Sequence, residues 1–150
     1  MGAVEDISPD RSSLRLLSEF EAFTALELFD HFVRPELLVK WWPEEATIDP
    51  RLGGSYDLRW PSRNWVLSGQ YTAFEPGKRL GFTWSWNFDS VKQPLQVDIT
   101  FEDAEPCTKM TVSHGPFDES EPAQIERNEI REGWIHFSMR LAGLRKGEAT

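Results

Sequence analysis

The sequence predicts an α+β fold in which an antiparallel sheet is covered on one face by a long C-terminal helix. Three observations carry this prediction. Apolar and polar residues alternate in most segments between residues 46 and 113, which is typical of strands with one buried face. A helical apolar stripe about twenty residues long follows near the C-terminus. Helix signals between the first strand and this series indicate two short helices.

The strands are predicted from alternation with a period of two. Leu14, Leu16 and Phe20 alternate with charged residues near the N-terminus. The clearest case is 95–102, where every second residue from Leu95 to Phe101 is apolar. Weaker alternation marks further strands at 56–60, 65–73, 80–86 and 110–113. With one more short strand after residue 46, we expect a sheet of about seven strands.

Two short helices are expected after the first strand. Thr24 and Glu27 have the spacing of a capping box, so a helix should begin at Ala25. Pro35 suits the first turn of a second helix, because its missing N–H is not needed there. Pro43 limits that helix, since the residue before a proline is pushed out of helical space.

The long C-terminal helix is predicted from spacings of four, three, four and three between large apolar residues. Pro122 stands at its start, with glutamates near the beginning and basic residues near the end, as the helix dipole favours. The apolar stripe consists of Ile130, Trp134, Phe137, Leu141 and Leu144. We expect one domain at 13–146, preceded by a flexible tail at 1–12 and followed by a C-terminal tail at 147–150.

Composition excludes several classes of partner. The 150 residues carry a net charge of −9, which disfavours nucleic acid and anionic membrane surfaces because both attract basic clusters. No apolar run approaches the length of about 20 residues that a membrane helix needs. The single Cys107 cannot form an internal disulfide, so we expect a cytoplasmic location.

No catalytic or metal-binding motif is present, and we assign no catalytic residue, metal or cofactor. The three histidines lack the spacing of zinc ligands. His31 lies among acidic residues on the first helix and is expected to be exposed. His136 falls away from the apolar stripe and is expected to lie at the side of the helix or to face solvent. His114 continues the inward phase of Met110 and Val112, either as a hydrogen-bonded core residue or as a ligand contact.

An ordered series of segments resembles a known family. "VRPELLVKWW", "DPRLGGSYDLRW", "GQYTAFEPGKRLGFTWSW", "LQVDITFE", "TKMTVSHGPF" and "REGWIHFSMRLAGL" follow one another as in the activator of heat-shock-protein-90 ATPase homologues, within the START-like (SRPBCC) superfamily. The resemblance runs from about Leu14 to Leu144. It implies a helix-grip fold, in which a curved sheet wraps around the C-terminal helix and leaves a cavity between them.

This architecture offers roles for two unusual dipeptides. Trp41 and Trp42 would end the second short helix and plug one end of the cavity mouth, with core packing preferred over a role as a ligand platform. Gly53 and Gly54 would lie at a sharp turn, where positive φ and close backbone approach favour glycine.

The resemblance implies binding of an apolar or aromatic small molecule by analogy with START-like relatives. Two alternatives stay open: a cyclase or hydrolase using His114 or Asp98, and a chaperone cofactor. The last is disfavoured because the eukaryotic activators carry an additional N-terminal domain. Binding without turnover is preferred, and a homodimer is left open. The expected cavity-lining residues are Tyr56, Tyr71, Phe82, Trp84, Trp86, His114, Trp134 and Phe137.

Overall fold

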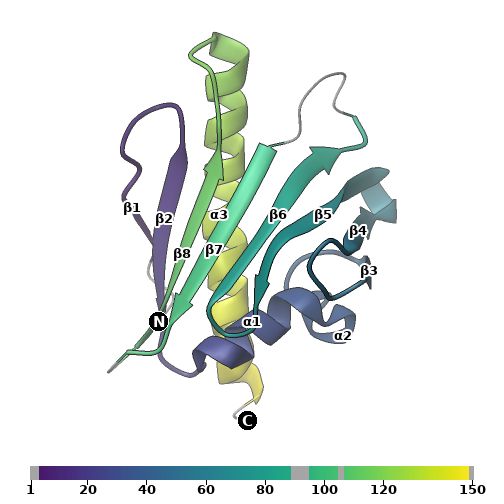
Figure 1. The fold of residues 1–150 in the computed structure, drawn as a ribbon, viewed down its shortest axis with the longest axis vertical. Helices are drawn as coiled ribbons and strands as arrows, with labels where there is room; N and C mark the ends of the chain where they lie inside the picture. Colours follow the sequence, from purple (N-terminus) through teal and green to yellow (C-terminus); the bar gives the residue numbers. More distant parts are fainter. Residues whose placement is uncertain (1–3, 89–94, 105–106, 149–150) are drawn as a thin grey trace.

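The computed structural model describes residues 4–88, 95–104 and 107–148. An eight-stranded antiparallel sheet curves around a long C-terminal helix, which runs behind the sheet in Figure 1. Two short helices lie across one end of the sheet (Figure 1). This is the helix-grip architecture that the resemblance implied. The elements are β1 (Val4–Asp6), β2 (Leu14–Phe20), α1 (Ala25–Val33), α2 (Pro35–Leu38), β3 (Glu45–Ile48), β4 (Ser55–Trp60), the 3₁₀ helix η1 (Pro61–Arg63), β5 (Trp65–Glu75), β6 (Arg79–Trp86), β7 (Leu95–Glu102), β8 (Thr108–Gly115) and α3 (Glu121–Glu148).

The strands lie side by side in the order β1-β2-β8-β7-β6-β5-β4-β3. Consecutive strands pair as hairpins from β3 to β8, and β8 then pairs with β2, with Leu16 opposite Val112. The alternation in β7 is confirmed, since Val97, Ile99 and Phe101 are buried. These side chains face the core because a period of two places every second residue on the same side of the sheet.

Helix α1 begins where the capping box predicts. The Thr24 side chain accepts a hydrogen bond from the Glu27 backbone N–H, and the Glu27 carboxylate accepts one from the Thr24 backbone N–H. The expectation for His31 is wrong, because this residue is buried. Its ring packs edge-on against Phe23 at 5.2 Å, and its Nδ1 donates to the Glu27 carbonyl at 2.8 Å. Acidic neighbours in sequence therefore did not indicate the face on which this ring lies.

The two adjacent tryptophans have different environments. Helix α2 ends at Leu38, and the chain continues through a turn in which Trp41 N–H bonds the Leu38 carbonyl. Trp41 is 1% exposed and its indole N–H donates to the His31 carbonyl at 3.1 Å. Trp42 is only partly buried. Core packing is thus right for Trp41, whereas Trp42 faces the cavity described below.

The two adjacent glycines are each required by the backbone. Gly53 has a φ of +82°, in the left-handed region that favours glycine. A Cβ atom at Gly54 would lie 2.1 Å from the Asp49 carbonyl oxygen, so no other residue fits without a backbone shift. Together they allow the chain to turn tightly from β3 into β4.

Residues 1–12 were expected to form a flexible tail, but the described part of this segment, residues 4–12, contains a strand. Residues Val4–Asp6 form β1, which pairs with β2 so that Val4 lies opposite Ser18. Polar residues without a period gave no strand signal here, and the pairing depends on the β2 edge. In the described part of the chain, no helix combines the length and apolar character needed to cross a bilayer.

Candidate functional site

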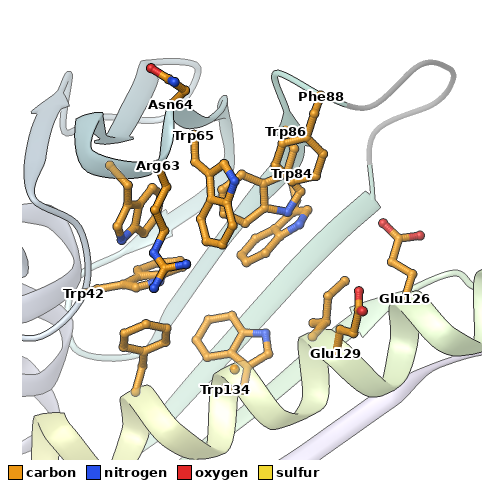
Figure 2. Close-up of a pocket in the computed structure, with 14 residues that line it drawn as sticks. Trp42, Arg63, Asn64, Trp65, Trp84, Trp86, Phe88, Glu126, Glu129 and Trp134 are labelled. Atoms are coloured by element: carbon orange, nitrogen blue, oxygen red, sulfur yellow. The ribbon is translucent and has the colours of Figure 1, made fainter.

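A cavity of about 800 Å³ lies between α3 and the half of the sheet formed by β4, β5 and β6. Figure 2 shows its walls: α3 on one side and the β4–β5 and β6 segments on the other. Its volume is within the range of about 300 to 1,000 Å³ that is usual for small-molecule sites. Six of the seven tryptophans line it. The full lining is Trp42, Trp60, Arg63, Asn64, Trp65, Trp84, Trp86, Phe88, Glu126, Glu129, Ile130, Gly133, Trp134 and Phe137.

The aromatic walls are formed by rings that support one another. Trp42 stacks on Trp84, with ring centroids 5.8 Å apart and planes 25° apart. Trp84 in turn meets Trp86 edge-on at 5.7 Å, and Trp86 stacks on Phe88 at 5.2 Å. Rings in such contacts hold their positions, because each pair adds about 0.5–1.5 kcal/mol beyond area burial. The result is a cavity with flat aromatic faces formed by rings that pack on one another.

The position of α3 is fixed from the side opposite the cavity. The Arg127 guanidinium donates to the Ser13 carbonyl at 2.9 and 3.1 Å, and Arg131 forms an ion pair with Asp6 at 2.7 Å. Gln124 adds a hydrogen bond to the Arg11 carbonyl at 2.9 Å. These contacts join the helix to the end of β1 and to the β1–β2 connection. They tie α3 to the β1–β2 edge of the sheet, whereas the cavity lies toward β4–β6.

The mouth of the cavity is braced by Asn87. Its side-chain oxygen accepts from the Val66 N–H at 2.9 Å, and its amide N–H donates to the Asn64 carbonyl at 3.1 Å. The Asn87 backbone N–H also donates to the Val66 carbonyl at 2.8 Å. Three hydrogen bonds therefore hold the tip of the β4–β5 hairpin against the end of β6. Asn64 there has a φ of +58°, a conformation that asparagine tolerates better than most residues.

Charged groups lie at the rim and not among the central rings. The Arg63 guanidinium sits 5.1 Å from the centroid of the Trp65 ring, a cation–π distance. Glu126 and Glu129 project from the first half of α3, across from Arg63 in Figure 2. The site thus combines an apolar aromatic interior with a few polar groups at its opening.

The structure divides the eight predicted lining residues into three groups. Trp84, Trp86, Trp134 and Phe137 lie in the wall of the large cavity. Tyr56, Tyr71 and Phe82 instead line a second, much smaller cavity of about 10 Å³. Burial raises the pKa of both tyrosines, so both remain neutral phenols at physiological pH.

His114, the eighth predicted residue, lies behind the wall and not in it. It is 1% exposed, and its Nδ1 accepts a hydrogen bond from the Trp134 indole N–H at 3.0 Å. An indole nitrogen can only donate, so the neutral imidazole carries its proton on Nε2. Burial lowers the pKa of His114 to about 3. At neutral pH the ring therefore supports Trp134 as an uncharged acceptor.

Asp98, the other residue considered for proton transfer, pairs with Arg79 at 2.9 Å and alternates with buried Val97 and Ile99. It does not line the cavity. Within residues 4–88, 95–104 and 107–148, no three His, Cys, Asp or Glu side chains gather as metal ligands would.

Sequence reasoning missed several lining residues. Trp60 and Trp65 face each other across the β4–β5 hairpin, and both were assigned only to strands. Trp42 was assigned to core packing together with its neighbour. Phe88 and Ile130 were not proposed either. A usable signal existed for the hairpin pair, because large rings at the end of one strand and the start of the next come together across a tight connection.

Comparisons with known proteins agree with this architecture. Protein MLL2253 from Mesorhizobium loti has 20% identity and a TM-score of 0.75, covering 88% of this chain and 95% of its own. CalU16 from Micromonospora echinospora has 21% identity and a TM-score of 0.65, covering 99% and 94%. The Aha1 dimer from Colwellia psychrerythraea has 15% identity and a TM-score of 0.73, covering 87% and 93%. Likeness at these identities shows a shared fold.

Among proteins with curated descriptions, none matches this sequence. The family model described as "Activator of Hsp90 ATPase homolog 1-like protein" matches residues 22–145, which run from just before α1 into α3 and include every residue named above as lining the large cavity. The chain therefore belongs to the Activator of Hsp90 ATPase homolog 1-like family.

Proposed function

We propose that the protein binds an apolar or aromatic small molecule in the large cavity and releases it unchanged. The observation that carries this proposal is the cavity of about 800 Å³ with six tryptophans in its wall. Flat rings of this kind offer large apolar contact areas and stack well on other aromatic systems. The charged groups at the rim would orient a polar substituent of the ligand, which is how mostly apolar sites obtain specificity.

The state of His114 favours binding over catalysis. A general base works best when its pKa is near the working pH, and burial places the pKa of His114 at about 3. Its Nδ1 is also engaged by Trp134. His114 lies behind the cavity wall and glutamine keeps an acceptor for the Trp134 indole, so in a binder His114→Gln should change ligand affinity by no more than about 12-fold, the equivalent of at most one hydrogen bond of about 1.5 kcal/mol. An enzyme that uses this ring would instead lose about 10²- to 10⁴-fold in turnover.

A cavity-filling variant tests the proposal directly. Gly133 lines the cavity, and a Cβ atom there would meet nothing within 4 Å. Gly133→Leu therefore places a side chain in the space that the ligand needs. The matched control is Gly143→Leu, at an exposed position of the same helix that is equally free of neighbours and outside the cavity.

Binding is measured by quenching of tryptophan fluorescence with a naphthalene derivative such as 2-naphthol. We expect Gly133→Leu to weaken binding at least tenfold, while Gly143→Leu binds like the wild type. Equal affinity of all three proteins, or no binding by the wild type to any of a panel of fused-ring aromatics, would contradict the proposal. Native mass spectrometry of the purified protein would then identify the natural ligand.

We also propose a homodimer and a cytoplasmic location. The solved Aha1 dimer from Colwellia psychrerythraea supports the first, and the unpaired Cys107 supports the second. Light scattering coupled to size exclusion should give twice the mass of 17.3 kDa. Fractionation of cells of the source organism, with antibody detection of the protein, should place it in the cytoplasmic fraction.

A further inference from the structure

One side chain, that of Trp42, lines both cavities. The smaller cavity is lined by Phe32, Leu38, Trp42, Tyr56, Leu58, Tyr71, Leu80 and Phe82. Trp42 is the only residue that this lining shares with that of the large cavity, among the residues that the structure describes. At about 10 Å³ the smaller cavity has room for no more than one water molecule.

Trp42 is held in this position by other rings. It stacks on Trp41 at 5.7 Å and on Trp84 at 5.8 Å, with planes 23° and 25° apart. Trp134 and Phe137 of α3 lie 5.6 and 6.2 Å from it on the helix side. The residue comes from the turn between α2 and β3, next to Pro43, which restricts the backbone there. Figure 2 shows the indole at the left end of the group of aromatic rings that line the cavity.

We propose that Trp42 is the partition that sets the length of ligand that the protein accepts. This inference rests on the proposed binding function and narrows its ligand class. In this proposal the Trp42 ring is the end wall of the large cavity, so the preferred ligand is a compact fused-ring aromatic and not a long acyl chain. Beyond the partition the walls are apolar, with Leu58, Leu80 and Phe82 buried. Removal of the indole would therefore join the cavities and admit an apolar tail.

The test measures how affinity depends on chain length. Isothermal titration calorimetry is carried out with ω-phenylalkanols in which the alkyl chain is lengthened one methylene at a time. Each additional buried methylene should raise affinity about fourfold, the equivalent of about 0.8 kcal/mol. For the wild type, this rise should stop at a short chain. For Trp42→Ala the rise should continue for at least two more methylenes. The variant should then bind these longer chains about 16-fold more tightly than if its affinity stopped rising at the chain length where that of the wild type does.

Two further variants make the test specific. Trp65→Ala removes an indole from the cavity wall at the mouth, where Trp65 is 38% exposed, so it should weaken binding of all chains by a similar factor and leave the chain length at which affinity stops rising unchanged. Leu58→Phe in the Trp42→Ala background refills the smaller cavity and should restore the original limit. Trp42→Leu, a milder truncation, should extend the limit by at least one methylene and serves if Trp42→Ala does not fold by circular dichroism.

The outcomes separate this inference from the binding function. If the wild type binds neither a phenylalkanol nor 2-naphthol, the binding function itself is wrong. If the wild type binds and its limit is the same in every folded Trp42 variant, the partition is wrong while the function stands. A wild type whose affinity keeps rising with long chains would also overturn the partition.

Discussion

Burial of His114 links the stability of the protein to pH. The folded-state pKa of about 3 lies below the unfolded value of 6.5, so the unfolded chain binds more protons between these two pH values. The stabilising contribution of the neutral ring is complete above pH 6.5 and is lost as the pH falls toward 3. The loss is at most about 1.4 kcal/mol per pH unit.

His114→Gln removes this titration and keeps an acceptor for the Trp134 indole. Between pH 6.5 and pH 4.5, we expect the wild type to lose about 2 kcal/mol more of its free energy of unfolding than the variant does. Urea unfolding at several pH values measures the difference. His136→Gln, at an exposed position on α3, is the control and should follow the wild type. Parallel profiles of wild type and His114→Gln would show that His114 does not carry the linkage.

The two classes of tryptophan should respond differently to truncation. Trp41 is 1% exposed and its indole is hydrogen-bonded to a backbone carbonyl, so Trp41→Ala should cost about 3–5 kcal/mol of unfolding free energy. Trp65 is 38% exposed at the cavity mouth, so Trp65→Ala should cost only about 1 kcal/mol. Chemical denaturation of both variants checks this. Equal losses of unfolding free energy in the two variants would mean that the aromatic wall of the cavity stabilises the fold as much as the buried core does.

For single residues, the sequence predicted which face of a strand a side chain lies on, but not which residues of other elements it contacts. Alternation placed His114 on the inner face correctly, yet its partner Trp134 comes from an element 20 residues away. His31 was misplaced because the ring of Phe23, which covers it, precedes the helix. The different environments of Trp41 and Trp42 could not be predicted from the sequence. In a turn, the directions of two adjacent side chains depend on the backbone angles, which the residue types alone do not determine.

Among the elements, α3 depends on contacts that its own apolar stripe does not reveal. Arg127 bonds the Ser13 carbonyl through two nitrogens, and this carbonyl belongs to the β1–β2 connection. Arg127→Ala should therefore lower the free energy of unfolding by about 1–2 kcal/mol, in the range for hydrogen bonds with a charged partner.

Asn128→Ala, one residue along the same helix at an exposed position, is the matched control and should cost less than about 0.5 kcal/mol. Urea unfolding measures both variants. Because Arg127 also sets the position of α3 relative to the sheet, Arg127→Ala should weaken 2-naphthol binding while Asn128→Ala leaves it unchanged. If Arg127→Ala lowers the free energy of unfolding no more than Asn128→Ala does, the hydrogen bonds from Arg127 to the Ser13 carbonyl do not hold the helix in place.

Element prediction succeeded where a period existed and failed where none did. The seven predicted strands are β2 to β8, and all of them except the short β3 bury apolar residues on one face. Strand β1 has only three residues with no buried side chain, so its sequence VED carries no alternation to read. It forms because the β2 edge offers unpaired backbone groups, which is a tertiary cause.

For the whole molecule, the fold followed from the order of its elements, but the cavity did not. The apolar faces of α3 and of the sheet could have closed on each other completely. The gap exists because Arg127 and Arg131 tie the helix toward one edge of the sheet while the rings of β4–β6 brace one another at the other side. Such geometry depends on long-range contacts, which is why only four of the eight proposed lining residues lie in the large cavity.

A protein that keeps a cavity open should gain stability when the cavity is filled, whether by a ligand or by a side chain. At a ligand concentration of 100 times Kd, binding stabilises the folded state by about 2.7 kcal/mol. For a chain of this size that raises Tm by about 5–11 °C. Without ligand, Gly133→Leu and Gly143→Leu should both be more stable than the wild type by about 0.5–1 kcal/mol, because each replaces a helical glycine.

The two glycine variants should then differ when 2-naphthol is added. Differential scanning calorimetry should show the full rise in Tm for the wild type and for Gly143→Leu, and almost none for Gly133→Leu, whose leucine occupies the space between Trp134 and the opposite wall. A Gly133→Leu variant that is stabilised by 2-naphthol as strongly as the wild type would place the ligand elsewhere on the molecule. A variant less stable than the wild type without ligand would mean that the side chain collides with the wall, and that the cavity is narrower at Gly133 than its lining indicates.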